Sequence, residues 1–147
     1  MADSKVSELT AATSVGGSDL LYLIQSNTSK KVTVANFMAN AANVTLSGNI
    51  NVGGTAQALA SPGAISLTTP ITHLTADATG GTLTLNQGTT GQVKYITMVA
   101  TSGGSYTLSA NIAGSGTVTF DHVGDTAQLL FTSTKWYVVG GTANVTY

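Results

Sequence analysis

The residues of this chain most capable of chemistry lie together at Asp121-His122-Val123-Gly124-Asp125. Two carboxylates and an imidazole within five residues can hold a hard cation or serve as a general acid and base. The same residues also match a common turn between strands, because Asp and Gly both favour turns. We favour the turn, and we expect no metal site, no cofactor and no catalytic residue in this protein.

The sequence contains only weak signals for other catalytic sites. His73 lies in an alternating stretch typical of a structural histidine on a strand, and its spacing from Asp77 fits no common metal motif. The sequence contains neither a Gly-x-Ser-x-Gly nucleophile elbow nor a Gly-x-x-x-x-Gly-Lys-Ser/Thr phosphate loop. A hydrolase that uses Asp121 and Asp125 remains a third hypothesis, behind two in which the protein is not an enzyme.

The composition instead indicates an assembly protein. Only 7% of the residues are charged, against roughly 25% in an ordinary soluble domain. A surface of short uncharged hydroxyl and amide side chains repels identical copies weakly and costs little to desolvate. The net charge of −1, without a single Arg, argues against nucleic-acid binding, which needs a positive cluster. No apolar run approaches the ~20 residues of a membrane span, so we expect no membrane partner.

Residues 1–43 predict a small module of mixed structure. Strands are expected at 20–25 and 30–34, joined into a hairpin by a turn at 27–29. Residues 35–42 favour a short helix by propensity. A helix of about two turns is marginal in isolation and needs a surface to pack on.

The rest of the chain predicts an extended arm and a β knob. Residues 44–62 are rich in Ala and Gly, which indicates an arm or linker with a free strand edge. From 63 to 147 a period-2 pattern broken by glycine pairs predicts an antiparallel β-sandwich or barrel. Its clearest hairpin spans 129–139, and we expect Trp136, with two Phe residues at 120 and 131, to anchor its core.

Two parts of the chain resemble proteins of tailed-phage particles. Residues 5–13 (KVSELTAAT), 19–24 (DLLYLI) and 29–37 (SKKVTVANF) resemble the opening "KISELT… DLLPIV… TKKITVANL" of many tail-fibre and head-surface proteins. In those proteins the opening lies at the end that attaches to the particle. Residues 118–141 are similar to β domains at the ends of phage fibres and of head decorations. The resemblance carries no catalytic residues.

This resemblance implies a structural protein on the outer surface of the phage virion. Because fibres with this opening usually continue for hundreds of residues, the short chain favours a capsid decoration (cement) protein. Such a protein would bind the assembled head as a homotrimer and stabilise contacts between major capsid proteins. Seven apolar residues of the first module are expected to dock on the particle: Leu20, Leu21, Leu23, Val32, Val34, Phe37 and Met38. For Phe37 and Met38, a private core of the module is an equal alternative.

The alternative function is that of a short tail-fibre or adhesin protein whose β knob binds a host surface glycan. Such a site needs exposed aromatic rings with polar neighbours. Tyr95, Tyr106 and Tyr147 are the candidates, although tyrosines on strands also serve cross-strand packing.

Overall fold

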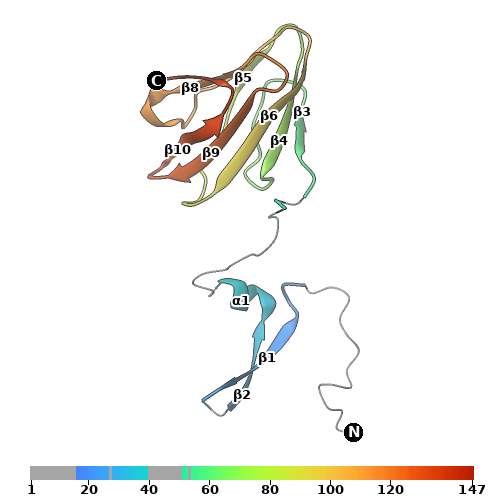
Figure 1. Ribbon diagram of the computed structural model, residues 1–147, viewed down its shortest axis with the longest axis vertical. Helices are drawn as coiled ribbons and strands as arrows, with labels where there is room; N and C mark the ends of the chain where they lie inside the picture. The colour runs from blue at the N-terminus through green and yellow to red at the C-terminus, as the bar shows by residue number, and fades with distance from the viewer. Residues whose placement is uncertain (1–15, 27, 40–50, 53) are drawn as a thin grey trace. The chain divides into compact units, whose positions relative to one another are not determined.

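The structure is a computed structural model that describes residues 16–26, 28–39, 51–52 and 54–147. The chain forms two compact units, Met1–Ile50 and Asn51–Tyr147 (Figure 1). Among the described residues, no helix has the length and apolar character needed to cross a membrane.

The first unit contains the predicted hairpin. Strands β1 (Leu20–Gln25) and β2 (Thr28–Thr33) pair antiparallel. In this register Leu21 lies opposite Val32. The prediction of two strands is confirmed, with β2 shifted towards the turn; Asn27 of the expected turn lies outside the described residues.

A short helix follows the hairpin directly. Helix α1 (Val34–Ala39) begins one residue before the predicted start at residue 35. Its N-cap is Thr33, whose Oγ1 accepts the backbone N–H of Asn36 at 3.2 Å. The backbone N–H of Val34 donates to the carbonyl of Asp19 at 2.9 Å, which ties the helix to the start of the hairpin. The last predicted helical residues, 40–42, lie outside the described part.

The second unit consists of two sheets. A five-stranded sheet has the order β10-β9-β6-β4-β3, and a four-stranded sheet has the order β11-β8-β7-β5. Neither sheet closes on itself, so the barrel alternative is excluded. The strands are β3 (Gln57–Leu59), β4 (Ile71–Ala76), β5 (Gly81–Leu83), β6 (Val93–Thr101), β7 (Tyr106–Leu108), β8 (Thr117–Phe120), β9 (Thr126–Thr132), β10 (Lys135–Gly141) and β11 (Asn144–Thr146).

The strand directions correct the antiparallel prediction in part. The pairs β3–β4, β4–β6 and β5–β7 are parallel, whereas the other pairs of the two sheets are antiparallel. For β4–β6 and β5–β7 the reason is the path of the chain, which alternates between the two sheets from β4 to β7. Two consecutive strands of one sheet are therefore separated by a strand of the other sheet, and they run in the same direction. A period-2 pattern identifies the buried face of a strand but does not encode its direction.

Strand β3 lies within 44–62, the stretch that the sequence predicted to be an arm. It pairs along β4, with Gln57 opposite Thr72. The Gln57 side chain accepts the N–H of Ser66 at 2.8 Å and donates to the carbonyl of Ala64 at 2.9 Å. This part of the expected arm is therefore an edge strand of the five-stranded sheet.

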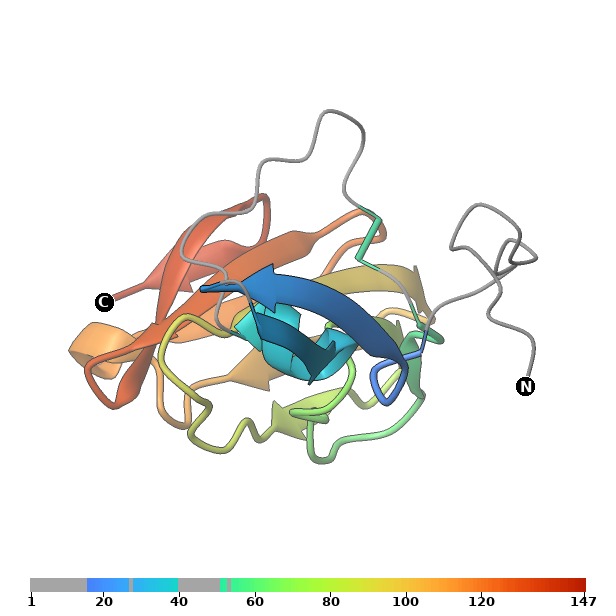
Figure 2. The same ribbon diagram turned by 90° about the horizontal axis from the view of Figure 1, so that it is seen from below.

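A single apolar core lies between the two sheets, which face each other (Figure 1, Figure 2). Trp136, Phe120 and Phe131 are all buried in it, as predicted. The rings of Phe131 and Trp136 meet edge to face with centroids 5.1 Å apart. The indole Nε1 of Trp136 donates to the carbonyl of Asn86 at 2.8 Å, so the one polar atom of this side chain is satisfied.

A polar layer lies at the end of the core where the three parallel strands begin. It joins Gln57, Thr72 and Lys94, of which Thr72 and Lys94 are fully buried. The Lys94 Nζ donates to Thr72 Oγ1 at 3.1 Å and to the carbonyl of Thr69, and Thr72 Oγ1 donates to Gln57 Oε1 at 3.2 Å. Burial lowers the pKa of Lys94 to about 8, because a charged amine loses its hydration there.

Candidate functional site

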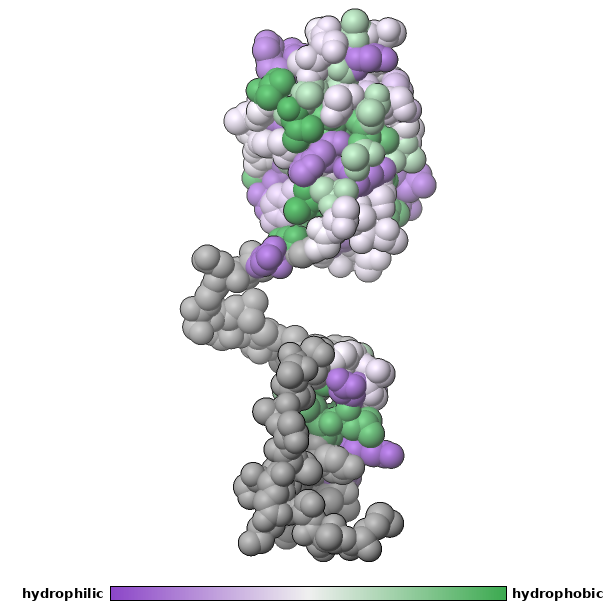
Figure 3. Space-filling model, turned by 90° about the vertical axis from the view of Figure 1, so that its right-hand side faces the viewer, coloured by the Kyte–Doolittle hydropathy of each residue, from purple (hydrophilic) through white to green (hydrophobic). Residues whose placement is uncertain are grey.

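The predicted docking residues lie on the hairpin and helix of the first unit. Leu20 and Phe37 are the most exposed, at 47% and 48%, and hydrophobic side chains are visible on the surface of this unit in Figure 3. Three further members are half-buried: Leu21, Val32 and Val34. The side chains of Leu23 and Met38 lie outside the described residues.

These residues are not all on one face of the hairpin. Leu21 and Val32 are direct cross-strand partners, so their side chains share a face. Leu20 precedes Leu21 on the same strand and points to the opposite face, where Thr33 is its partner. The structure thus brings Leu21 and Val32 together and separates them from Leu20.

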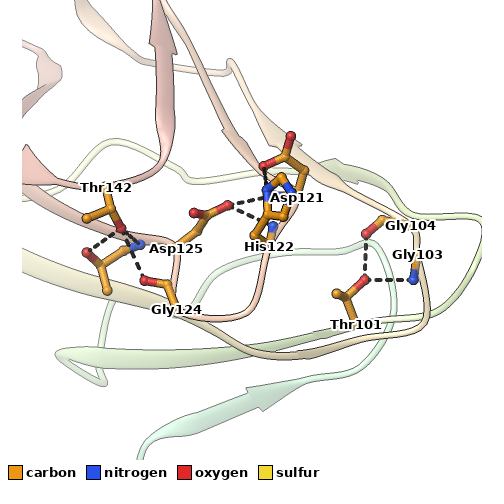
Figure 4. A network of polar contacts seen from close by, with 9 residues as sticks. Thr101, Gly103, Gly104, Asp121, His122, Gly124, Asp125 and Thr142 are labelled. Carbon is orange, nitrogen blue, oxygen red and sulfur yellow. Dashed lines mark hydrogen bonds and ion pairs between the residues drawn. The ribbon is translucent and has the colours of Figure 1, made fainter.

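The acidic segment at the end of β8 has the geometry of the predicted turn (Figure 4). Asp125 Oδ2 accepts the backbone N–H groups of Asp121 and His122, both at 2.9 Å. Asp121 Oδ1 lies 2.8 Å from His122 Nδ1. Asp121, His122 and Asp125 each offer a potential metal ligand within 4.8 Å of the others. The Asp125 carboxylate already closes the turn, with Gly124 at a φ of 96° inside it.

The ionisation of Asp125 fits this structural role. Burial alone would raise its pKa, but hydrogen bonds from the backbone N–H groups of His122 and Asp121 outweigh that effect and hold the pKa below its ordinary value. The side chain of Asp121 and the charge of His122 act in the same direction. A carboxyl with a lowered pKa stays ionised at neutral pH and is a poor proton donor. Asp125 is therefore better suited to closing the turn than to acid catalysis.

The turn is also fastened to the sheet behind it. The N–H of Met98 donates to the carbonyl of Asp125 at 2.8 Å, and the N–H of Gly124 donates to the carbonyl of Met98 at 2.9 Å. Thr142 Oγ1 donates to the carbonyl of Gly124 at 3.1 Å. These contacts attach the turn to β6 and to the segment between β10 and β11.

The three candidate tyrosines have different surroundings. Tyr106 is fully buried and donates its hydroxyl to the carbonyl of Thr75 at 3.2 Å, so it is a core residue and unavailable to a glycan. Tyr147 is 73% exposed, and its ring packs beside Gly116. Tyr95 is half-buried on β6 and lies on the face turned away from the core.

A shallow hollow of about 270 Å³ lies beside Tyr95 on this outer face of the five-stranded sheet. Gly140 is the cross-strand partner of Gln128, which is the partner of Tyr95, so one end of this row lacks a side chain. The lining residues are Tyr95, Ile96, Thr97, Thr126, Ala127, Gln128 and Gly141. None of them is charged. Sequence reasoning missed this hollow, because it treated the pair Gly140-Gly141 only as a break between strands.

A second surface is the edge formed by β10 and β11, which are edge strands of the two sheets. Its apolar side chains are exposed: Val139 by 53%, Val145 by 37% and Tyr147 by 73%. Residues 136–147 contain no charged side chain. Edge strands usually carry charges, prolines or bulges that prevent association; here Lys135 stands at the start of β10, and a bulge lies between Val138 and Gly140. We call these residues, 136–147, the uncharged edge.

Comparisons with protein-family models, with curated proteins and with solved structures found no match to this chain.

Proposed function

We propose that this chain is a non-enzymatic structural protein of a tailed-phage particle, located on the outer surface of the virion. It is a capsid decoration (cement) protein that binds the assembled head as a homotrimer and stabilises contacts between major capsid proteins. A ligand that binds only the assembled shell stabilises that shell by mass action. The resemblance of residues 5–13, 19–24 and 29–37 to phage attachment segments supports this assignment.

The observation that carries the proposal is the exposure of two large apolar side chains on the first unit. Leu20 and Phe37 leave nearly half of their surface open to solvent, at positions where the resemblance implies attachment. Full burial of such a side chain is worth about 1.5–3 kcal/mol, so covering the exposed half of each against a partner contributes roughly 0.7–1.5 kcal/mol. They are therefore suited to hold this unit on a protein shell.

The uncharged edge supports the trimer. It presents free strand edges and exposed valines without charge repulsion between copies. Association through this edge would pair strands from neighbouring copies and bury Val139 and Val145. The low charge of the whole chain favours the same outcome.

Cosedimentation with purified heads tests the proposal. The full chain is mixed with assembled heads of the phage that encodes it, and separately with its unassembled major capsid protein. We expect binding to assembled heads only, and we expect the double variant Leu20→Ser, Phe37→Ser to lose it. Val123→Ser is the matched control, because Val123 is 62% exposed on the second unit. Unchanged head binding by the double variant, or binding to tails alone, would refute the proposal.

A further inference from the structure

On the outer face of the five-stranded sheet, side chains from neighbouring strands surround the hollow. Tyr95 lies in one cross-strand row between Ile71 and Gln128. The next row along the strands places Thr97 between His73 and Thr126. An aromatic ring, an amide and two hydroxyl groups therefore converge on one uncharged hollow.

We propose that this hollow binds one residue of a neutral saccharide. The ring of Tyr95 offers an apolar surface to the C–H face of a sugar. The amide of Gln128 and the hydroxyls of Thr97 and Thr126 offer both donors and acceptors to sugar hydroxyls. This combination of an apolar wall and a few convergent polar groups is typical of a small-molecule site.

The polar groups in the hollow are only loosely satisfied by one another. Gln128 Nε2 donates to the Tyr95 hydroxyl at 3.4 Å, which is longer than the usual 2.7–3.2 Å. Thr126 Oγ1 lies 3.3 Å from Thr142 Oγ1. Exchange of such long contacts for hydrogen bonds to a ligand costs little, because the enthalpy lost is small.

Size and charge restrict the ligand further. A volume of about 270 Å³ is below the 300–1,000 Å³ of sites for drug-sized ligands, so it suits a single sugar ring within a longer chain. Because no lining residue is charged, a uronic or sialic acid would lose hydration without gaining an ionic partner. The ligand is therefore a neutral hexose or N-acetylhexosamine residue.

Substitution of Gly140, the cross-strand partner of Gln128, gives a specific test of the hollow. A Cβ at Gly140 would lie 3.7 Å from Gln128 Oε1, which is an ordinary contact, so Gly140→Val adds side-chain volume next to Gln128, a lining residue of the hollow. Tyr95→Leu removes the aromatic wall, and Gln128→Ala removes the amide. Val123→Ser is the control, because it changes an exposed side chain outside both the hollow and the uncharged edge.

The full chain is first screened on an array of neutral oligosaccharides of glucose, galactose, mannose and N-acetylglucosamine, with uronic and sialic acids as charged comparisons. The best ligand is then titrated by NMR while the backbone amides of Tyr95, Gln128 and Gly141 are followed. We expect a neutral ligand to shift these amides. We expect Tyr95→Leu and Gly140→Val each to weaken binding about tenfold, and Val123→Ser to leave it unchanged.

Three outcomes overturn the inference: no neutral oligosaccharide shifts these amides, only charged saccharides bind, or the hollow variants bind as tightly as the parent chain. Thermal unfolding identifies any variant that fails to fold. If Tyr95→Leu or Gly140→Val is lost in this way, the binding affinities of Gln128→Ala and of the remaining variant test the proposal. The inference does not depend on where the protein sits on a particle. Its failure would leave the head-binding result intact, and loss of head binding would leave the saccharide result intact.

Discussion

Replacement of Lys94 by Met is predicted to remove a specific pH dependence of stability. Lys94 is fully buried on the inward face of β6, and its amine donates to two neutral oxygens, those of Thr69 and Thr72. Within the described residues, the only ion pair joins Asp121 and His122, so no carboxylate pairs with this amine. The folded state therefore releases the Lys94 proton more readily than the unfolded chain does.

The magnitude follows from the shift in pKa. Burial lowers the pKa of Lys94 from 10.5 to about 8, which corresponds to a maximum of about 3 kcal/mol. As pH falls from 10.5 to 8, the unfolded chain binds the proton first and the folded state is progressively destabilised; below pH 8 the loss is complete. Between pH 7 and pH 9.5 this linkage raises the free energy of unfolding by about 2 kcal/mol.

Urea unfolding of the parent chain, Lys94→Met and Lys135→Met between pH 7 and pH 9.5 measures the effect. We expect the parent and the exposed-lysine variant Lys135→Met to gain about 2 kcal/mol over this range, and Lys94→Met to remain flat. The comparison uses the slope with pH, because Met also leaves the Thr69 carbonyl without its donor. The range stops below pH 10, because burial and then the charge of Asp77 raise the pKa of Tyr106, which destabilises the fold at higher pH. Equal slopes for the parent and Lys94→Met would refute this reasoning.

Three further predictions concern turns and packing. Ser133 and Thr134 join β9 to β10 with φ of 49° and 72°, so the change to Asn-Gly should raise the free energy of unfolding by about 1 kcal/mol in urea; no gain would contradict the turn geometry. A Cβ at Gly88 would lie 2.8 Å from Trp136 Cζ2, so Gly88→Ala should cost about 1–3 kcal/mol and shift the tryptophan fluorescence; an unchanged spectrum would show that the ring is not packed there. Because its pKa is lowered, Asp125 stabilises the fold at pH values above the ordinary carboxyl range, and this stabilisation is lost as pH falls below about 4. Asp125→Asn should lower the free energy of unfolding by about 1 kcal/mol at pH 7 and reduce its decrease at acidic pH. An unchanged decrease at acidic pH would argue against the hydrogen bonds to this carboxylate.

The elements with strong local signals could be predicted from the sequence. The first hairpin, the start of α1 and the β9–β10 hairpin all carry alternating patterns with turn residues between them. The burial of Trp136 follows from the size of its ring. These features are determined by residues that lie close together in the sequence, and alternating patterns and turn residues are informative over such short distances.

The remaining features depend on contacts between distant segments. In β6 both alternating sets contain apolar residues, and the inward set proves to be the one with Lys94, Ile96 and Met98. The carbonyl and hydroxyl that receive the Lys94 amine come from residues 69 and 72, a pairing created by the parallel strands. The hollow beside Tyr95 likewise depends on segments that are distant in the sequence, because its lining comes from β6, from β9 and from Gly141 of β10.

The central claim, that this chain is a decoration protein of a phage head, is tested most directly by cryo-electron microscopy of the intact particle that carries it. The account predicts trimeric density at the three-fold positions of the capsid, with the first unit against the shell. Density for the chain at the tail alone would contradict the claim and assign the protein to the fibres.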